Sequence, residues 1–211
     1  MFVQMCVKGV NYITLDDAKD ILRKRGLVCT WGRLARQISS AEIDQRLTEQ
    51  ELYLHLHAFD EKHPARGGLV RNETPFISLT AGSVQRDAFL AQNVVHPAHE
   101  IAMDFATDFG QRQGDCFVFR CWVFVGAQPN VAVRSQAEEV RELHTYTKYS
   151  PVQPLGEIVA KIEVPARQIE KFEHYQYVRG GQGKLQIRRL GIYDNPNYID
   201  PHTVTNYRDH L

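Results

Sequence analysis

The fold is decided by the stretch Gly156-Glu157-Ile158-Val159-Ala160-Lys161-Ile162-Glu163-Val164. Every second residue from Ile158 to Val164 is apolar, and Pro165 follows, so the pattern predicts a strand with one buried face that ends at the proline. Glu157 comes directly after a glycine at the start of this strand. The sequence therefore predicts a carboxylate at the end of a strand of the main sheet.

A second informative segment lies upstream, between a turn at Thr74-Pro75 and the glycine at position 82. Phe76 to Thr80 is rich in β-branched and aromatic residues, which predicts a short strand. Ser78 and Thr80 are two residues apart, so their hydroxyl groups share one face of that strand. The segment is expected to bring a hydroxyl pair to the sheet.

A third segment, Leu52 to His57, switches to a period of two. Leu52, Leu54 and Leu56 would face one way, and the rings of Tyr53, His55 and His57 would face the other. We interpret it as the first strand of the sheet, with the two imidazoles on its polar face.

Other elements follow from caps and periodicity. Thr14 with Asp17 is a helix start signal and Gly26 a stop, so residues 15–25 are expected to form the first of two or three short helices that precede the first strand. A helix is expected from Pro97 to Gly110, and Cys116 to Val125 reads as a strand covered on both faces that pairs with 157–164. Residues 172–178 and 185–192 read as a hairpin.

These elements predict an α+β chain in three parts. Residues 1–50 would form an N-terminal helical extension, 51–193 a domain built on a split mixed or antiparallel sheet, and 194–211 a polar arm on the surface.

Composition narrows the classes of function. The 211 residues include 25 basic and 25 acidic side chains, so no global field draws the chain to nucleic acid or to an anionic membrane. No apolar stretch approaches the roughly 20 residues of a membrane-spanning helix. The four cysteines form no CxxC pair, and no His/Cys group has zinc spacing, so we expect reduced thiols, no metal and a cytoplasmic chain.

An imidazole, a hydroxyl pair and a carboxylate, each on its own strand and in this order, resemble the ADP-ribosyltransferase superfamily of bacterial toxins and related enzymes. The resemblance spans roughly Glu51 to Gln176. It implies a split mixed β-sheet and NAD as substrate. In that family a first-strand arginine or histidine, a second-strand Ser-Thr-Ser motif or tyrosine, and a late-strand glutamate form the NAD site.

The resemblance assigns roles to five residues. It implies His55 or His57 as the first-strand NAD ligand, Ser78 and Thr80 as groups that brace the carboxylate, and Glu157 as the catalytic carboxylate. Tyr146 and Tyr149, in the segment leading to Glu157, offer flat faces for the nicotinamide ring or for a target base.

Two positions depart from the family pattern. No arginine lies between Tyr53 and His57, which points to histidine-type members or to lost activity. Leu155 occupies the position two before the glutamate, where arginine-modifying and several base-modifying members carry glutamate or glutamine, so an arginine acceptor is disfavoured.

Three functions stay open at this stage. The first is NAD-dependent mono-ADP-ribosyl transfer to a macromolecule, either nucleic acid or protein, by a toxin or immunity effector that is delivered into a target cytoplasm and has an antitoxin or immunity partner. The second is an NAD glycohydrolase that uses water as acceptor. The third is a non-enzymatic module that keeps the fold and binds a partner.

Overall fold

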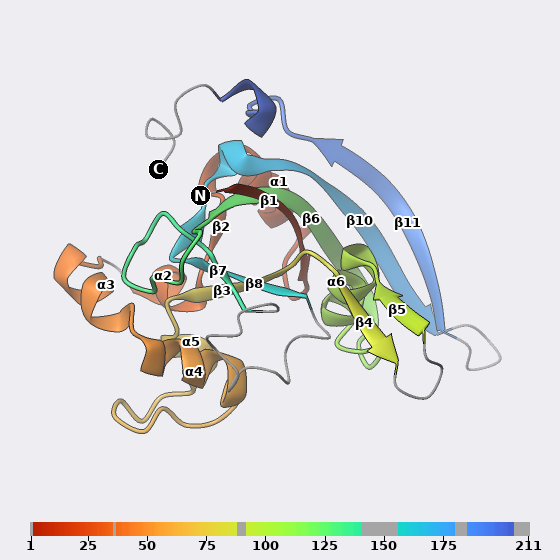
Figure 1. Cartoon of the computed structure of the whole chain (residues 1–211). Coiled ribbons are helices and arrows are strands. Elements are labelled where there is room, and N and C mark those ends of the chain that lie inside the picture. The colour runs from red at the N-terminus through yellow and green to blue at the C-terminus, as the bar shows by residue number, and fades with distance from the viewer. Residues whose placement is uncertain (1, 36, 88–91, 141–155, 180–184, 205–211) are drawn as a thin grey trace.

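The computed structural model describes residues 2–35, 37–87, 92–140, 156–179 and 185–204. Its centre is a seven-stranded sheet in the order β11-β10-β6-β1-β3-β8-β7, and every ladder in it is antiparallel (Figure 1). Short helices cover both faces, so the predicted α+β class with a mostly antiparallel sheet is confirmed. The strands are β1 (Phe2–Val10), β3 (Phe76–Thr80), β6 (Gly114–Val125), β7 (Glu138–Glu139), β8 (Glu157–Lys161), β10 (Ile169–Arg179) and β11 (Leu185–Asp194).

Strand β1 lies in the middle of this sheet. It pairs with β6 along its whole length, from Phe2 opposite Val125 to Val10 opposite Phe117. The prediction that only helices precede the first strand is therefore wrong, and so is the predicted pairing of β6 with residues 157–164. The sequence pattern did not predict a strand in the first ten residues. The strand that pairs with β6 was therefore missing from the prediction.

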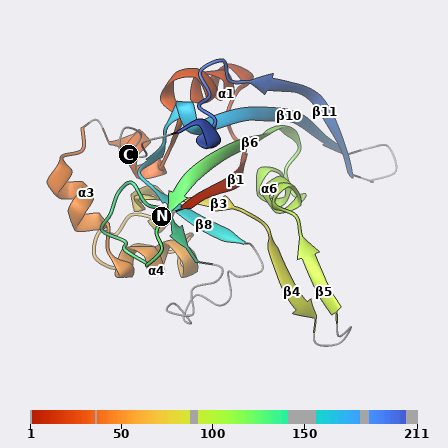
Figure 2. The same cartoon turned by 45° about the horizontal axis from the view of Figure 1, so that its top comes forward.

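The sheet splits between β1 and β3. These strands share a single registered pair, Val7 opposite Thr80, whereas β3 and β8 pair along five residues from Phe76 opposite Lys161 to Thr80 opposite Glu157. Figure 2 shows β3 and β8 turning away from the curved ribbon of β1, β6, β10 and β11. Polar side chains at the split can therefore face a space between two parts of the sheet.

The N-terminal helices begin where the caps predict. Thr14 and Asp17 form a reciprocal capping box before α1 (Leu15–Asp20), which continues as one π-helical turn, η1 (Ile21–Arg25), and stops at Gly26 with φ 74°. The predicted helix over 15–25 is confirmed. Leu22 is fully buried in the large core on the face of the sheet that carries Phe117 and Phe119.

Residues 52–57 are helical, so the predicted strand there is wrong. Helix α4 (Glu49–His57) starts at Thr48, whose hydroxyl accepts a hydrogen bond from the backbone N–H of Glu51 at 3.2 Å. The threonine followed three residues later by glutamate is a helix start signal that the period-two pattern masked. Leu52 and Leu54 are both buried because the protein covers more than one side of this helix.

An ion-pair group fixes α4 against the segment that follows it. The carboxylate of Glu51 accepts hydrogen bonds from His63 Nε2 at 3.0 Å and from the Arg66 guanidinium at 2.5 Å. Arg66 also contacts Glu73 of α5 (Val70–Glu73), which in turn binds Arg46. Helix α4 is thereby held in one orientation next to β3.

The remaining elements are short helices, strands and turns. They are β2 (Leu27–Val28), α2 (Thr30–Leu34), α3 (Ser40–Arg46), β4 (Ser83–Asp87), β5 (Gln92–His96), β9 (Glu163–Val164), and the 3₁₀ turns η3 (Ala166–Gln168) and η4 (Pro201–Thr203). The predicted strand 157–164 is interrupted at Ile162, where φ is 63°, and β9 beyond it pairs with β2. The predicted hairpin is confirmed as β10 and β11. Within the described residues no helix has the length and apolar character needed to cross a membrane.

Helix α6 (Ala98–Ala106) packs directly on β1 at Gly9. A Cβ at Gly9 would lie 1.9 Å from the carbonyl oxygen of Ala102, so only glycine permits this contact. We expect Gly9→Ala to lower the free energy of unfolding by about 2 kcal/mol, because α6 must move off the strand. Urea unfolding measures it. Gly67→Ala, which meets no atom within 4 Å but has φ 76°, separates this steric cost from backbone strain. Unchanged stability in Gly9→Ala would contradict the close packing.

Candidate active site

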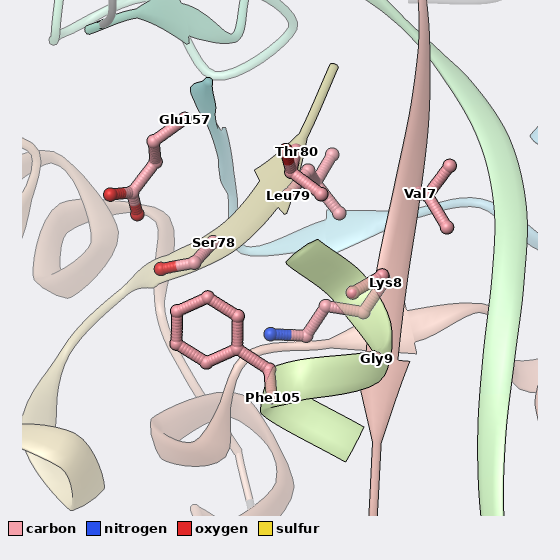
Figure 3. A pocket seen from close by; sticks show the side chains of 9 residues that line it. Val7, Lys8, Gly9, Ser78, Leu79, Thr80, Phe105 and Glu157 are labelled. Carbon is pink, nitrogen blue, oxygen red and sulfur yellow. The ribbon is translucent and has the colours of Figure 1, made fainter. Parts of the chain in front are cut away.

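A small cavity of about 40 Å³ lies at the split of the sheet. Side chains from β1, β3, β8 and α6 line it, and Figure 3 shows Lys8, Ser78 and Glu157 directed toward the same space, with the ring of Phe105 at its edge. The complete lining is Val7, Lys8, Gly9, Ser78, Leu79, Thr80, Ala102, Phe105 and Glu157. The cavity thus brings together a cation, a hydroxyl group and a carboxylate from three strands.

Glu157 is placed by a close approach of two backbone segments. Gly156 has φ 57°, and a Cβ there would lie 2.2 Å from the carbonyl oxygen of Gly82. The backbone N–H of Ala81 donates to the carbonyl of Gly156 at 2.9 Å. The glycine before Glu157 therefore allows β8 to begin against the end of β3, which sets the carboxylate beside Ser78.

The carboxyl group of Glu157 is 7% exposed. Burial raises its pKa above the ordinary range, while a hydrogen bond with the Ser78 side chain and the positive charge of Lys8 act in the opposite direction. A carboxylate in such surroundings interacts more strongly with a nearby positive charge than it would in water.

Lys8 is the charged side chain of β1 in this cavity, and sequence reasoning missed it. Burial lowers its pKa, and the carboxylate of Glu157 raises it. The signal was present in the sequence as a single charged residue in the mostly apolar segment from Phe2 to Val10. A cation in a mostly apolar strand favours a functional or paired role.

His55 lies behind Ser78 rather than in the cavity. Its Nε2 is 2.9 Å from Ser78 Oγ, and its Nδ1 is 3.0 Å from Thr74 Oγ1. The ring is 4% exposed, and burial, with the charge of Lys8, lowers its pKa to about 3. His55 is therefore a neutral imidazole that contacts the site through a serine.

The other predicted site residues do not all line the cavity. Thr80 lines the cavity and lies opposite Glu157 in the β3–β8 ladder, but its hydroxyl accepts from the backbone N–H of Gly82 at 3.1 Å. His57 ends α4, with its ring 4.7 Å from that of Tyr53, and is not among the residues that line the cavity. Tyr146 and Tyr149 lie outside the described residues, so their roles stay predictions.

Phe105 of α6 borders the cavity and pairs with a second aromatic ring beyond the helix. Phe105 is 41% exposed, and its ring meets that of Phe109 edge-on at 5.2 Å. The helix ends at Ala106, so the predicted continuation to Gly110 is wrong: Asp108 and Phe109 have φ values of 51° and 50°. Left-handed backbone at consecutive non-glycine residues costs about 1–2 kcal/mol each, and here it turns Phe109 back toward Phe105.

A second, larger cavity of about 470 Å³ shares no lining residue with the first. Both cations that line it are already paired. Arg134 contacts Asp44 at 2.7 Å, and Lys161 is bonded to Glu138 and to the carbonyl groups of Asn130 and Val133 at 2.7–2.8 Å. Among the described residues no group of three or more His, Cys, Asp or Glu side chains is arranged to hold a metal ion. The cavity at the split holds a carboxylate, hydroxyl groups and a cation from three strands of the main sheet.

Comparison with known proteins bears on the fold alone. No protein-family model and no curated sequence matches the chain. Among solved structures, EcPltA is 15% identical, with 94% of this chain and 89% of EcPltA covered and a TM-score of 0.50. A heat-labile enterotoxin variant is 14% identical (93% and 77% covered, TM-score 0.44), and the catalytic domain of the mosquitocidal toxin from Bacillus sphaericus is 13% identical (95% and 58% covered, TM-score 0.43).

The chain has the fold of the ADP-ribosyltransferase toxins. The resemblance implied an arginine or histidine on the first strand, and the first strand of the structure is β1 rather than residues 52–57. Its charged side chain in the cavity is Lys8. The absence of arginine from residues 53–57 therefore does not describe the first strand, because that strand is β1 and its charged residue is a lysine.

Proposed function

We propose that the chain cleaves the bond between nicotinamide and ribose in NAD and transfers ADP-ribose to a macromolecular acceptor. The observation that carries the proposal is the meeting of Lys8, Ser78 and Glu157 in one cavity at the split of the sheet. Their positions on the first, second and late strands follow the order that the resemblance implied.

Each group has a chemical role in this proposal. When the C1′–N bond breaks, its electron pair goes to the nicotinamide ring and positive charge develops on the ribose. Glu157 stabilises that charge, and its low exposure strengthens the interaction. Lys8 binds the diphosphate, and the exposed face of Phe105 packs against a ring of the dinucleotide. A nucleophile then bonds to C1′ and releases its proton.

The size of the cavity limits how NAD can bind. About 40 Å³ is far below the roughly 300–1,000 Å³ of typical ligand pockets, so only one end of the dinucleotide enters it. We place the nicotinamide ribose there, because Glu157 must lie near C1′. The rest of NAD would extend along the surface past Phe105.

The chemical class of the acceptor is what the proposal still has to identify. Leu155, two positions before Glu157, favours an acceptor other than an arginine side chain, or water. Incubation with NAD labelled in the adenylate part, together with separate protein, RNA and DNA fractions, tests this. Label on a macromolecule supports transfer; free ADP-ribose alone supports the glycohydrolase, and unchanged NAD supports the non-enzymatic module.

Lys8→Met is expected to weaken NAD binding by about 10- to 100-fold, because it removes a charge-assisted hydrogen bond to the diphosphate. Lys8→Arg keeps the charge and should retain most of the affinity. Titration calorimetry measures both. Lys19→Met, which removes a lysine from α1 that lies 3.7 Å from Asp16, is the matched control. Equal affinity in Lys8→Met and wild type would remove Lys8 from the NAD site.

A further inference from the structure

A series of side-chain hydrogen bonds runs through the protein to Glu157. The backbone N–H of Phe76 donates to Thr74 Oγ1 at 3.2 Å, and Thr74 Oγ1 lies 3.0 Å from His55 Nδ1. His55 Nε2 lies 2.9 Å from Ser78 Oγ, and the Ser78 side chain bonds to Glu157. The series links α4, through the start and middle of β3, to the first residue of β8.

The donors in this series all point one way. The carboxylate of Glu157 has no proton to donate, so the Ser78 O–H donates to it. Ser78 Oγ then accepts the proton of His55 Nε2. A neutral imidazole protonated at Nε2 accepts at Nδ1, so the Thr74 O–H donates there. Each hydroxyl group is thus given a single orientation.

We propose that His55 is a positioning residue that acts through Ser78 to orient and hold the Glu157 carboxylate. The expected effect of His55 on catalysis rests on the proposed function. Its expected effect on the Glu157 carboxylate does not. His55 touches neither the cavity nor, in the proposed complex, the substrate. It fixes the hydroxyl group that in turn fixes the carboxylate.

The surroundings of His55 suit this role. The ring packs edge-on against Phe59 at 5.4 Å and lies 5.7 Å from the ring of Phe76, so it has little freedom to rotate. On the same helix, Glu51 is anchored by His63 and Arg66. The donor at Nε2 is therefore held in place from two directions before any ligand arrives.

Two substitutions of His55 separate positioning from simple packing. In His55→Gln the amide nitrogen can reach the place of Nε2 and still donate to Ser78, whereas the shorter side chain of His55→Asn ends near Nδ1. We expect His55→Asn to lower kcat for NAD cleavage by about tenfold with KM unchanged, and His55→Gln to recover most of the loss. In a Ser78→Ala background the two variants should have equal kcat.

The controls and contrary outcomes are as follows. His202→Asn, an exposed histidine on η4, should leave kcat unchanged. Equal losses in the Asn and Gln variants, or a difference between them that persists without the Ser78 hydroxyl group, would overturn the positioning role. Such results would leave NAD cleavage itself intact.

A second measurement does not depend on activity. The Ser78 hydrogen bond lowers the pKa of Glu157, and among the described residues Lys8 is the charged group that acts on it. Carboxyl carbon NMR titration of Glu157 should therefore give a higher pKa in His55→Asn than in wild type, and a value near wild type in His55→Gln. Identical titration in all three proteins overturns the proposal, even in a chain that proves not to cleave NAD.

Discussion

Glu157→Gln is expected to slow release of nicotinamide from NAD by about 10²- to 10³-fold while the chain stays folded. Glutamine keeps the volume of the side chain but carries no charge, so it cannot stabilise the positive ribose that forms as the C1′–N bond breaks. Chromatographic detection of free nicotinamide measures the rate, and far-ultraviolet circular dichroism checks the fold.

Glu163→Gln is the matched control for this experiment. Glu163 is an exposed glutamate on β9, just beyond β8, and it does not line the cavity at the split. Its neutralisation should leave the rate unchanged. If Glu157→Gln cleaves NAD within about threefold of wild type, less than 1 kcal/mol of barrier separates them and Glu157 is not the catalytic carboxylate.

The second large effect is a pH dependence of stability that comes from His55. Its pKa falls from the ordinary 6.5 to about 3 in the folded protein, so the unfolded chain binds the proton more tightly. The contribution of the neutral ring is complete above pH 6.5 and is lost as the pH falls toward 3. Between pH 7 and pH 4 the loss amounts to about 3 kcal/mol in the free energy of unfolding.

Urea unfolding of wild type and His55→Gln at both pH values isolates this contribution. All other titrating groups are common to the two proteins, so they cancel in the comparison. Wild type should lose about 3 kcal/mol more than the glutamine variant on acidification. Parallel losses would show that His55 keeps an ordinary pKa in the folded protein.

The local sequence pattern predicted strands and helices correctly where a single segment determines them. The β-branched and aromatic residues from Phe76 to Thr80 and the alternation from Glu157 onward predicted β3 and β8, and these two strands do pair. The cap at Thr14 with the stop at Gly26 predicted the first helix. Ser78 and Glu157 were chosen from those segments, and the structure places both in the lining of the cavity at the split.

The sequence pattern led to a wrong prediction where both a strand period and a helix period fit the same residues. Leu52, Leu54 and Leu56 alternate as in a strand, yet they form a helix whose buried side chains do not share one stripe, since Leu52 and Leu54 are both buried. The surrounding loop, tied to Glu51 by His63 and Arg66, covers the additional side. Such cover is a tertiary effect, because it depends on residues more than ten positions away in the sequence.

The sequence by itself determined the α+β class, the β3 and β8 strands, and the choice of Glu157 and Ser78, because each depends on side-chain alternation and turn residues within a short stretch. Only the tertiary structure decided that β1 lies at the centre of the sheet and contributes Lys8, and that His55 meets Ser78 from a helix. Those contacts join residues 23 to about 150 positions apart, and their geometry depends on strand order and helix packing rather than on any local pattern.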